Sequence, residues 1–133
     1  MARKWTADVM IIDDDPITRT LVTKYMETEN RVSVIHATEG HSAIKLAKKH
    51  KPDLILLDWR LPGIQGIDIL VELKAIKKTQ NIPVVMLTGK SKVKDMERAF
   101  SHGAENFIAK PFTGMELKRK VFENLPNVIL SKQ

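Results

Sequence analysis

The 133-residue sequence predicts an α/β fold in which helices cover both faces of an open, parallel sheet. Two observations support this prediction. The apolar runs VMII, LILL and PVVML are continuous rather than alternating, which is typical of strands buried on both faces of a parallel sheet. Segments of helical period alternate with such runs along the chain, and this alternation predicts parallel strands joined by right-handed crossovers.

The predicted strands are short and rich in β-branched residues. In chain order they are Val9–Ile12, Val32–His36, Leu54–Leu57, Pro83–Leu87 and Asn106–Ile108. Sheets of this kind bind ligands outside the carboxyl ends of their strands, so the residues after each run are the first candidates for a functional site. The second run is followed by Ala37 and Thr38, which carry little chemistry, and we expect this strand at an edge of the sheet.

Helices are predicted between and after these strands. They are Ile17–Glu29, His41–His50, Ile67–Lys78, Lys92–His102 and Glu116–Asn124. Before the last helix, Thr113 and Glu116 have the spacing of a capping box, and Phe112 is placed to pack against Leu117. Gly103 is placed to end the fourth helix.

The first strand leads directly into three carboxylates and a proline, in the stretch VMIIDDDP. Adjacent anions repel one another unless a cation or a backbone role offsets the cost. Either Asp14 or Asp15 can cap a helix that starts at Pro16, because a carboxylate accepts a free amide hydrogen bond there. A cap needs only one acid, so a bound cation is a second explanation for the cluster.

Composition limits the classes of function. The chain has 22 Lys plus Arg against 16 Asp plus Glu, a net charge of +6, and many cations fall late in predicted helices, where they complement the helix dipole. No recognition-helix motif or basic stripe with interleaved aromatics is present, so we predict no direct nucleic-acid binding. The absence of cysteine excludes disulfides, thiolate metal sites and cysteine nucleophiles.

Targeting signals are also missing from the sequence. The basic start MARKW is followed only by the short run Val9–Ile12, too little for the apolar region of a signal peptide. No stretch approaches the roughly 20 apolar residues of a membrane helix. We therefore predict a cytoplasmic protein without a membrane partner.

Chemically active residues follow most of the predicted strands. They are Asp13 and Asp14 after the first, Asp58 after the third, Thr88 after the fourth and Lys110 after the fifth. Converging carboxylates suit a hard divalent cation such as Mg²⁺. An aspartate can attack phosphorus to form an acyl phosphate, while a metal ion and an ammonium neutralise the incoming charge and a hydroxyl donates a hydrogen bond. The set is therefore suited to phosphoryl transfer onto Asp58.

Four ordered motifs, IIDDDP, DLILLDWRLPGIQG, VVMLTG and FIAKPF, make the chain resemble the receiver domains of two-component response regulators. The resemblance extends from Val9 to about Asn124. It implies a flavodoxin-like (βα)5 fold with a five-stranded parallel sheet in the order 2-1-3-4-5. It also implies an N-terminal extension over residues 1–7, a receiver domain over 8–125, and a C-terminal tail or start of a linker over 126–133.

The resemblance implies a role for each acidic residue. Asp58 would be the phosphoacceptor, receiving a phosphoryl group from a phosphohistidine on a sensor histidine kinase or a histidine phosphotransfer protein. The Mg²⁺ ligands would be Asp14, Asp58 and the backbone carbonyl of Arg60, with Asp13 assisting through a water molecule. Asp15 is left for the helix cap. Such a domain is not an enzyme beyond catalysing its own phosphorylation and dephosphorylation.

The resemblance also implies a switch. Thr88 and Lys110 would contact the phosphoryl oxygens, and the Lys110–Pro111 peptide would be cis. Thr88 would move toward the phosphoryl group and Phe107 would change rotamer behind it. The face formed by the fourth helix, the fifth strand and the fifth helix would then control an effector domain, a protein target or a homodimer.

Four positions depart from the usual pattern of the family, among them Gly89, which stands after Thr88 where alanine is frequent. Phe107 stands where tyrosine is common, so only a steric switch is available. Arg60 and Lys90, two residues after Asp58 and Thr88, flank the predicted phosphoryl position. They either prolong the life of the acyl phosphate and weaken Mg²⁺ binding, or point into solvent.

Lysines also crowd the start of the fourth predicted helix. They are Lys90, Lys92 and Lys94. The helix dipole disfavours cations at this end, so helix propensity does not explain them. They either bind an acidic surface of a partner, form a dimer contact, or are ordinary solvated lysines.

Two other functions use similar residues. A haloacid-dehalogenase-type phosphatase would use Asp13 as the nucleophile and Asp15 as the acid. It would, however, need a threonine where Ile17 stands and an acidic pair after Lys110, and it would leave Asp58 without a role. A pseudo-receiver that never carries phosphate is the second alternative, although such modules usually lose one member of the acid, threonine and lysine set.

Overall fold

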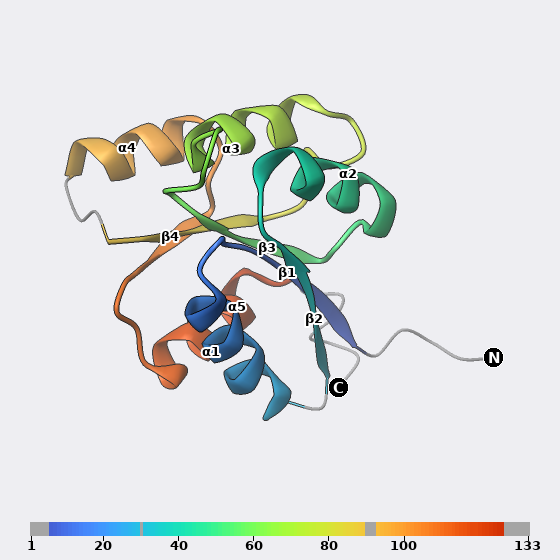
Figure 1. The fold of residues 1–133 in the computed structure, drawn as a ribbon, viewed down its shortest axis with the longest axis vertical. Coiled ribbons are helices and arrows are strands. Elements are labelled where there is room, and N and C mark those ends of the chain that lie inside the picture. Colours follow the sequence, from blue (N-terminus) through green and yellow to red (C-terminus); the bar gives the residue numbers. More distant parts are fainter. Residues whose placement is uncertain (1–5, 30, 90–92, 127–133) are drawn as a thin grey trace.

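The computed structural model describes residues 6–29, 31–89 and 93–126, in which five strands alternate with five helices (Figure 1). The strands are β1 (Ala7–Ile12), β2 (Val32–Ala37), β3 (Leu54–Asp58), β4 (Val84–Thr88) and β5 (Asn106–Ala109). The helices are α1 (Pro16–Glu27), α2 (Gly40–His50), α3 (Gly66–Ala75), α4 (Val93–Ser101) and α5 (Gly114–Asn124). Each predicted strand and helix is confirmed, with shifts of a few residues at the ends.

The strands form one parallel sheet in the order β2-β1-β3-β4-β5, as predicted. The central strand β3 is buried along its whole length, which explains its continuous apolar run. β2 lies at an edge of the sheet, as expected from the lack of acidic or basic residues directly after it. Near the other carboxyl ends, the paired residues are Ile12–Leu57, Asp58–Leu87 and Thr88–Ala109. This register brings the residues that follow β1, β3, β4 and β5 to one edge of the sheet, the carboxyl edge.

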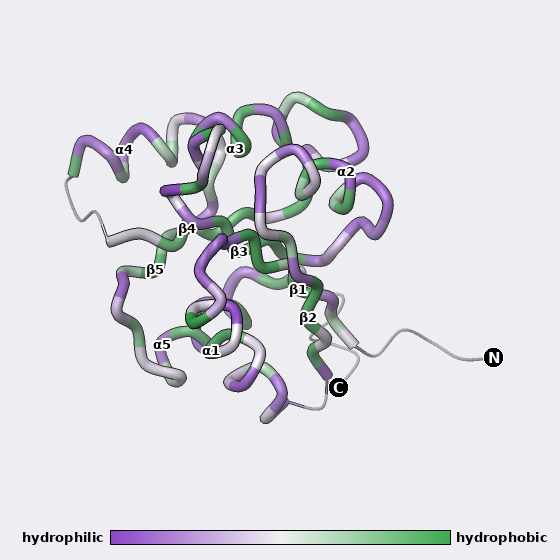
Figure 2. Tube along the Cα trace, in the orientation of Figure 1, coloured by the Kyte–Doolittle hydropathy of each residue, from purple (hydrophilic) through white to green (hydrophobic). Residues whose placement is uncertain are grey.

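The helices cover the two faces of the sheet unequally: α2, α3 and α4 lie on one face, and α1 and α5 on the other (Figure 1). Figure 2 shows that the most hydrophobic segments are the central strands, with polar residues on the outer sides of the helices. Each face has its own apolar core. Leu70 and Leu73 of α3 belong to the first core, and Val22 of α1 and Leu117 of α5 belong to the second. The amphipathic periodicity of the predicted helices is therefore explained by core packing.

The predicted end of α3 was wrong by three residues. The helix ends at Ala75 rather than at Lys78. The cause is Thr79, whose fully buried hydroxyl donates to the backbone carbonyl of Leu73 at 2.6 Å. That carbonyl would otherwise accept the amide hydrogen of the next helical turn, so the side chain replaces the helical bond.

The predicted helix caps are confirmed. Asp15 is the N-cap of α1, and its carboxylate accepts a hydrogen bond from the amide of Ile17 at 2.9 Å. Thr113 is the N-cap of α5, and its hydroxyl accepts from the amide of Glu116 at 3.1 Å. Gly103, just after α4, has a φ of +104°, the backbone conformation that favours glycine at a helix end.

The helices are short. α1, the longest in the described part of the chain, has 12 residues. A bilayer-spanning helix needs about 20 apolar residues. Accordingly, none of the helices within residues 6–29, 31–89 and 93–126 has the length and apolarity to cross a membrane.

Candidate functional site

The residues predicted to act together line one cleft of about 570 Å³ at the carboxyl edge. Its polar lining includes Asp14, Asp58, Arg60, Thr88 and Lys110. Asp13 is fully buried and contacts the cleft through Lys110. The fold therefore brings together all five groups whose convergence the sequence predicted, from β1, β3, β4 and β5.

Three carboxylates form the acidic part of the site. Asp13, Asp14 and Asp58 each offer an oxygen, and these oxygens lie within 4.8 Å of one another. Asp13 and Asp58 are buried, at 0% and 7% exposure, whereas Asp14 is exposed to solvent. All of these donor atoms are carboxylate oxygens, the ligand type that Mg²⁺ prefers, so the donor set fits this ion.

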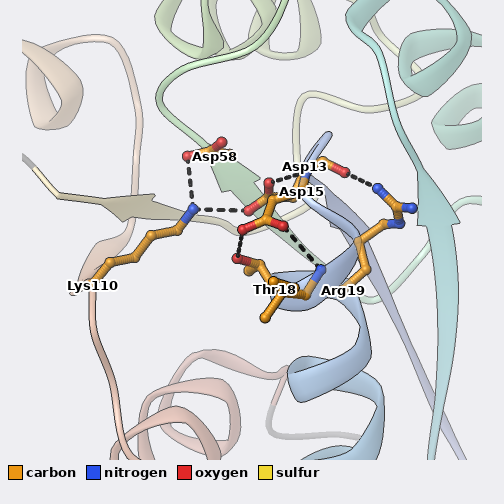
Figure 3. Close-up of polar contacts among 7 residues, drawn as sticks. Asp13, Asp15, Thr18, Arg19, Asp58 and Lys110 are labelled. Atoms are coloured by element: carbon orange, nitrogen blue, oxygen red, sulfur yellow. Dashed lines mark hydrogen bonds and ion pairs between the residues drawn. The ribbon is translucent and has the colours of Figure 1, made fainter.

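Lys110 lies against two of these carboxylates (Figure 3). Its Nζ atom donates to Oδ2 of Asp13 at 2.9 Å and to Oδ1 of Asp58 at 3.2 Å. This ammonium offsets part of the repulsion within the acidic cluster, a role that the sequence had suggested only for a divalent cation. The peptide bond between Lys110 and Pro111 is cis, as predicted.

The other oxygen of Asp13 holds the turn between β1 and α1. Oδ1 of Asp13 accepts the amide hydrogen of Asp15 at 2.9 Å, and Asp15 in turn caps α1 (Figure 3). Both oxygens of Asp13 are therefore engaged by protein groups. Asp14 lies between Asp13 and Asp15 in the chain, and its carboxylate is exposed. It is therefore better suited than Asp13 to bind a metal ion directly.

The burial of the cluster changes its acidity. Burial raises the pKa of Asp58 from 3.8 to about 6, the charge of Asp13 acts in the same direction, and the ammonium of Lys110 opposes both. Burial acts to lower the pKa of Lys110, but its hydrogen bond to Asp13 and the charges of Asp58 and Asp13 raise that pKa overall. At neutral pH the site therefore holds an ionised, poorly solvated Asp58 carboxylate against a charged lysine.

The loop after β3 packs closely on the phosphoacceptor candidate. Gly66, the first residue of α3, donates its amide hydrogen to the carbonyl of Trp59 at 2.9 Å. A Cβ atom at position 66 would collide with the backbone carbonyl oxygen of Asp58. The glycine is therefore required by a close approach of α3 to the strand end that carries Asp58.

We expect the substitution Gly66→Ala to lower the free energy of unfolding by about 2 kcal/mol, because the backbone of β3 or α3 must move to admit the methyl group. Urea denaturation measures this difference. Gly89→Ala is the matched control, since a Cβ atom at position 89 meets open space. Equal stability of the two variants would contradict the close approach.

A second, smaller cavity lies between the cleft and α4. Thr88 and Trp59 line both the cleft and this cavity, and Phe107 lines the cavity from β5. Phe107 is half-buried and packs edge-on against Phe100 of α4, with ring centroids 6.2 Å apart. The residues predicted to form the switch are thus neighbours, and Thr88 lies between the cleft and the aromatic ring.

Lys120 of α5 also contacts Phe107. Its ammonium lies 4.6 Å from the centroid of the Phe107 ring and donates to the backbone carbonyl of Phe107 at 2.7 Å. A cation over an aromatic face is attracted by the electron density of the ring. In this structure Phe107 therefore contacts both α4 and α5.

Two of the predicted cationic positions, Lys90 and Lys92, lie outside the described residues. Lys94 is exposed near the start of α4, and Arg60 is exposed where it lines the cleft. The proposed roles of these cations remain predictions.

Sequence reasoning missed three contacts of the site. The pairing of Asp13 with Lys110 joins residues 97 positions apart, and no local pattern indicates it. Arg19, whose guanidinium reaches back to the carbonyl of Asp13, was not considered, although it stands one helical turn after the cap at Asp15. The third is the close approach of Gly66 to the backbone of Asp58. The glycine at the start of the helix after Asp58 was the sequence signal for it.

The fold and the site define a doubly wound α/β domain with an acidic, lysine-containing cleft at the carboxyl edge of its parallel sheet. Residues 9–122 match the family model described as the response regulator receiver domain. The chain belongs to this family, the receiver domains of two-component systems.

Relatives support the assignment. The chain is 36% identical over 121 residues to the phosphate regulon transcriptional regulatory protein PhoB of Escherichia coli, covering 91% of this chain and 51% of that protein. It is 32% identical over 120 residues to the chemotaxis protein CheY-3 of Vibrio cholerae, covering 88% and 92%. It thus spans about half the length of PhoB but most of CheY-3.

A solved structure shows the same fold with a metal ion. The receiver domain of the sensor histidine kinase PA1611 from Pseudomonas aeruginosa, with a magnesium ion coordinated in its active-site cleft, matches with a TM-score of 0.81. The two sequences are 25% identical, and the match covers 90% of this chain and 97% of that one.

The phosphatase alternative conflicts with the family match and with the contacts of Asp15. A phosphatase of that type would need Asp15 as a free acid. Oδ1 of Asp15 instead accepts the amide hydrogen of Ile17, and Oδ2 accepts the hydroxyl hydrogen of Thr18 at 3.1 Å (Figure 3). Asp15 therefore serves as a helix cap.

Proposed function

We propose that Asp58 accepts a phosphoryl group from a phosphohistidine on a sensor histidine kinase or a histidine phosphotransfer protein. The observation that carries the proposal is the position of the Asp58 carboxylate: it is buried, it ends a central strand, and it contacts both an ammonium and an acidic cluster. A carboxylate in this setting is poorly solvated, which favours its use as a nucleophile.

The residues of the chain have separate tasks in this transfer. An oxygen of Asp58 attacks phosphorus, the bond from phosphorus to the donor nitrogen breaks, and the electron pair of that bond leaves with the imidazole. Lys110, already 3.2 Å from Asp58, neutralises charge on the phosphoryl oxygens, and the Thr88 hydroxyl donates a hydrogen bond to one of them. Positioning and charge neutralisation supply most of the catalysis in phosphoryl transfer.

Asp14, Asp58 and the backbone carbonyl of Arg60 would hold Mg²⁺, with Asp13 acting through a bound water. Bound there, Mg²⁺ would neutralise negative charge shared between the acidic cluster and the phosphoryl group. The set of carboxylate oxygens within 4.8 Å supports this assignment, as does the magnesium-bound cleft of the PA1611 receiver domain.

Phosphorylation would then change the face formed by α4, β5 and α5. A phosphoryl group adds about −1.5 to −2 charge next to Thr88. Movement of Thr88 toward this charge would open space behind it, which the Phe107 ring can enter from β5. Val93 and Phe100 of α4 are exposed apolar residues on this face, at 63% and 45%, and would contact an effector domain, a protein target or a second copy of the chain.

Acetyl phosphate provides the test. The chain incubated with acetyl phosphate and Mg²⁺ should gain the mass of one phosphoryl group in intact-protein mass spectrometry. The gain should disappear in EDTA and in the Asp58→Asn variant. A wild-type chain that gains no mass would contradict the proposal and favour a pseudo-receiver that acts without phosphate.

Arg60 should prolong the phosphorylated state. Its exposed guanidinium lines the cleft and is free to pair with phosphoryl oxygens or to obstruct an incoming water. We expect Arg60→Asn to speed dephosphorylation by up to about fivefold, the effect of one exposed ion pair, and to tighten Mg²⁺ binding. The decay of the phosphorylated mass over time measures the rate, with Arg119→Asn on α5 as the control. An unchanged rate would mean that Arg60 points into solvent.

A further inference from the structure

Arg19 connects α1 to the end of the first strand. Its Nη1 atom donates to the backbone carbonyl of Asp13 at 2.8 Å (Figure 3). The amide of the same residue, Asp13, donates to the carbonyl of Ala37 in β2 at 3.1 Å. The backbone of Asp13 is thus held on one side by the sheet and on the other by a charged side chain from the helix. Hydrogen bonds from a charged donor are stronger than neutral ones.

Besides the contact of Asp13 with Lys110, the turn that follows is held by hydrogen bonds between close neighbours in the chain. It is closed by two consecutive side-chain hydrogen bonds, from the amide of Asp15 to Asp13 and from the amide of Ile17 to Asp15, each 2.9 Å long. Asp14 lies inside this turn, and its carboxylate is exposed. The position of the Asp14 carboxylate is therefore set through the backbone on either side of it.

Arg19 itself is well anchored. Its amide donates to the carbonyl of Asp15 at 3.1 Å, and its carbonyl accepts the hydroxyl hydrogen of Thr23 at 2.8 Å. One turn further along α1, Val22 is fully buried in the core between the helix and the sheet. The guanidinium thus links a helix fixed by core packing to the carbonyl of Asp13.

We infer that Arg19 is a positioning residue for the divalent cation: it holds the turn from Asp13 to Asp15 in the conformation that presents the Asp14 carboxylate beside Asp58. This inference rests on the proposed function, since it takes Mg²⁺ to be the ion of the site. Groups that orient metal ligands from outside the coordination shell affect metal affinity by about 10- to 100-fold.

Charge alone predicts the opposite result. Arg19 is a cation near a cation site, and removing it would lower the repulsion felt by Mg²⁺ and tighten binding. Loss of positioning would weaken binding. The sign of the change in affinity therefore separates the two effects.

The experiment compares Arg19→Met and Arg19→Lys with Arg119→Met, which removes the same charge from an exposed pair with Glu123 on α5. Amide hydrogen exchange is followed by NMR in the metal-free protein, and the same samples are then titrated with Mg²⁺. We expect Arg19→Met to weaken Mg²⁺ binding about 10-fold and to speed exchange at the amides of Asp15 and Ile17. Arg19→Lys should be intermediate, and Arg119→Met should match the wild type.

Two results would overturn the inference. One is Arg19→Met protein that binds Mg²⁺ as tightly as the wild type or more tightly. The other is unchanged exchange at the amides of Asp15 and Ile17. A wild-type chain that binds no Mg²⁺ would instead refute the proposed function, and the exchange measurement, made without metal, would still report whether Arg19 holds the turn.

Discussion

Replacing Lys110 by methionine should lower the free energy of unfolding by about 3 kcal/mol and slow phosphorylation by acetyl phosphate about 100-fold or more. The first effect follows because Asp13 is fully buried and Lys110 contacts its Oδ2 atom, so the variant leaves a buried carboxylate without this cation. The second follows because Lys110 is the ammonium nearest the attacking oxygen in the described part of the chain.

Thermal or urea unfolding measures the first effect, and the rate of mass gain measures the second. Lys48→Met, on the exposed side of α2, is the matched control and should change neither quantity. Millimolar Mg²⁺ should restore part of the lost stability in Lys110→Met, because a divalent ion can replace the missing charge. If Lys110→Met were as stable and as rapidly phosphorylated as Lys48→Met, the central role of this lysine would be refuted.

Replacing Asp58 by asparagine should stabilise the metal-free fold near neutral pH while it abolishes phosphorylation. Burial raises the pKa of Asp58 in the folded state from 3.8 to about 6. Between these values the folded protein binds more protons than the unfolded chain, so stability falls as the pH rises through this window. Well above pH 6, where Asp58 is ionised in both states, the penalty is complete and amounts to about 3 kcal/mol, which the neutral asparagine avoids.

The test is the unfolding free energy of the wild type and Asp58→Asn in EDTA across the acidic range. The variant should be more stable by up to about 3 kcal/mol at neutral pH, and the difference should shrink as the pH falls and vanish below about pH 3, where the aspartate is protonated in both states. Mg²⁺ should stabilise the wild type more than the variant. A stability difference that does not change with pH would mean that the charge of Asp58 is not what destabilises the fold.

Much of the fold could be predicted from the sequence because its signals are local. The continuous apolar strands, the cap at Asp15 and the capping box at Thr113 each depend on residues a few positions apart. The end of α3 could not be predicted, since it depends on a buried hydroxyl from Thr79 beyond the helix. Local patterns do not reveal whether a later side chain will replace a helical hydrogen bond.

The residues of the site could be predicted from the sequence, but the contacts between them could not. Parallel strands bring their carboxyl ends to one edge, so Asp58, Thr88 and Lys110 could be grouped from the sequence alone. Their partners depend on side-chain geometry, as the bridge of Lys110 between Asp13 and Asp58 shows. The link from Arg19 to the carbonyl of Asp13 was equally hidden, because an arginine early in a helix is ordinarily solvated.

The most direct test of the phosphoacceptor assignment is chemical mapping of the modified residue. Borohydride reduces an aspartyl phosphate to homoserine, so peptide mass spectrometry after treatment with acetyl phosphate, Mg²⁺ and borohydride identifies the aspartate that carried the phosphoryl group. Homoserine at position 58 alone is the predicted result. Homoserine at position 13, or at no position, would contradict the account.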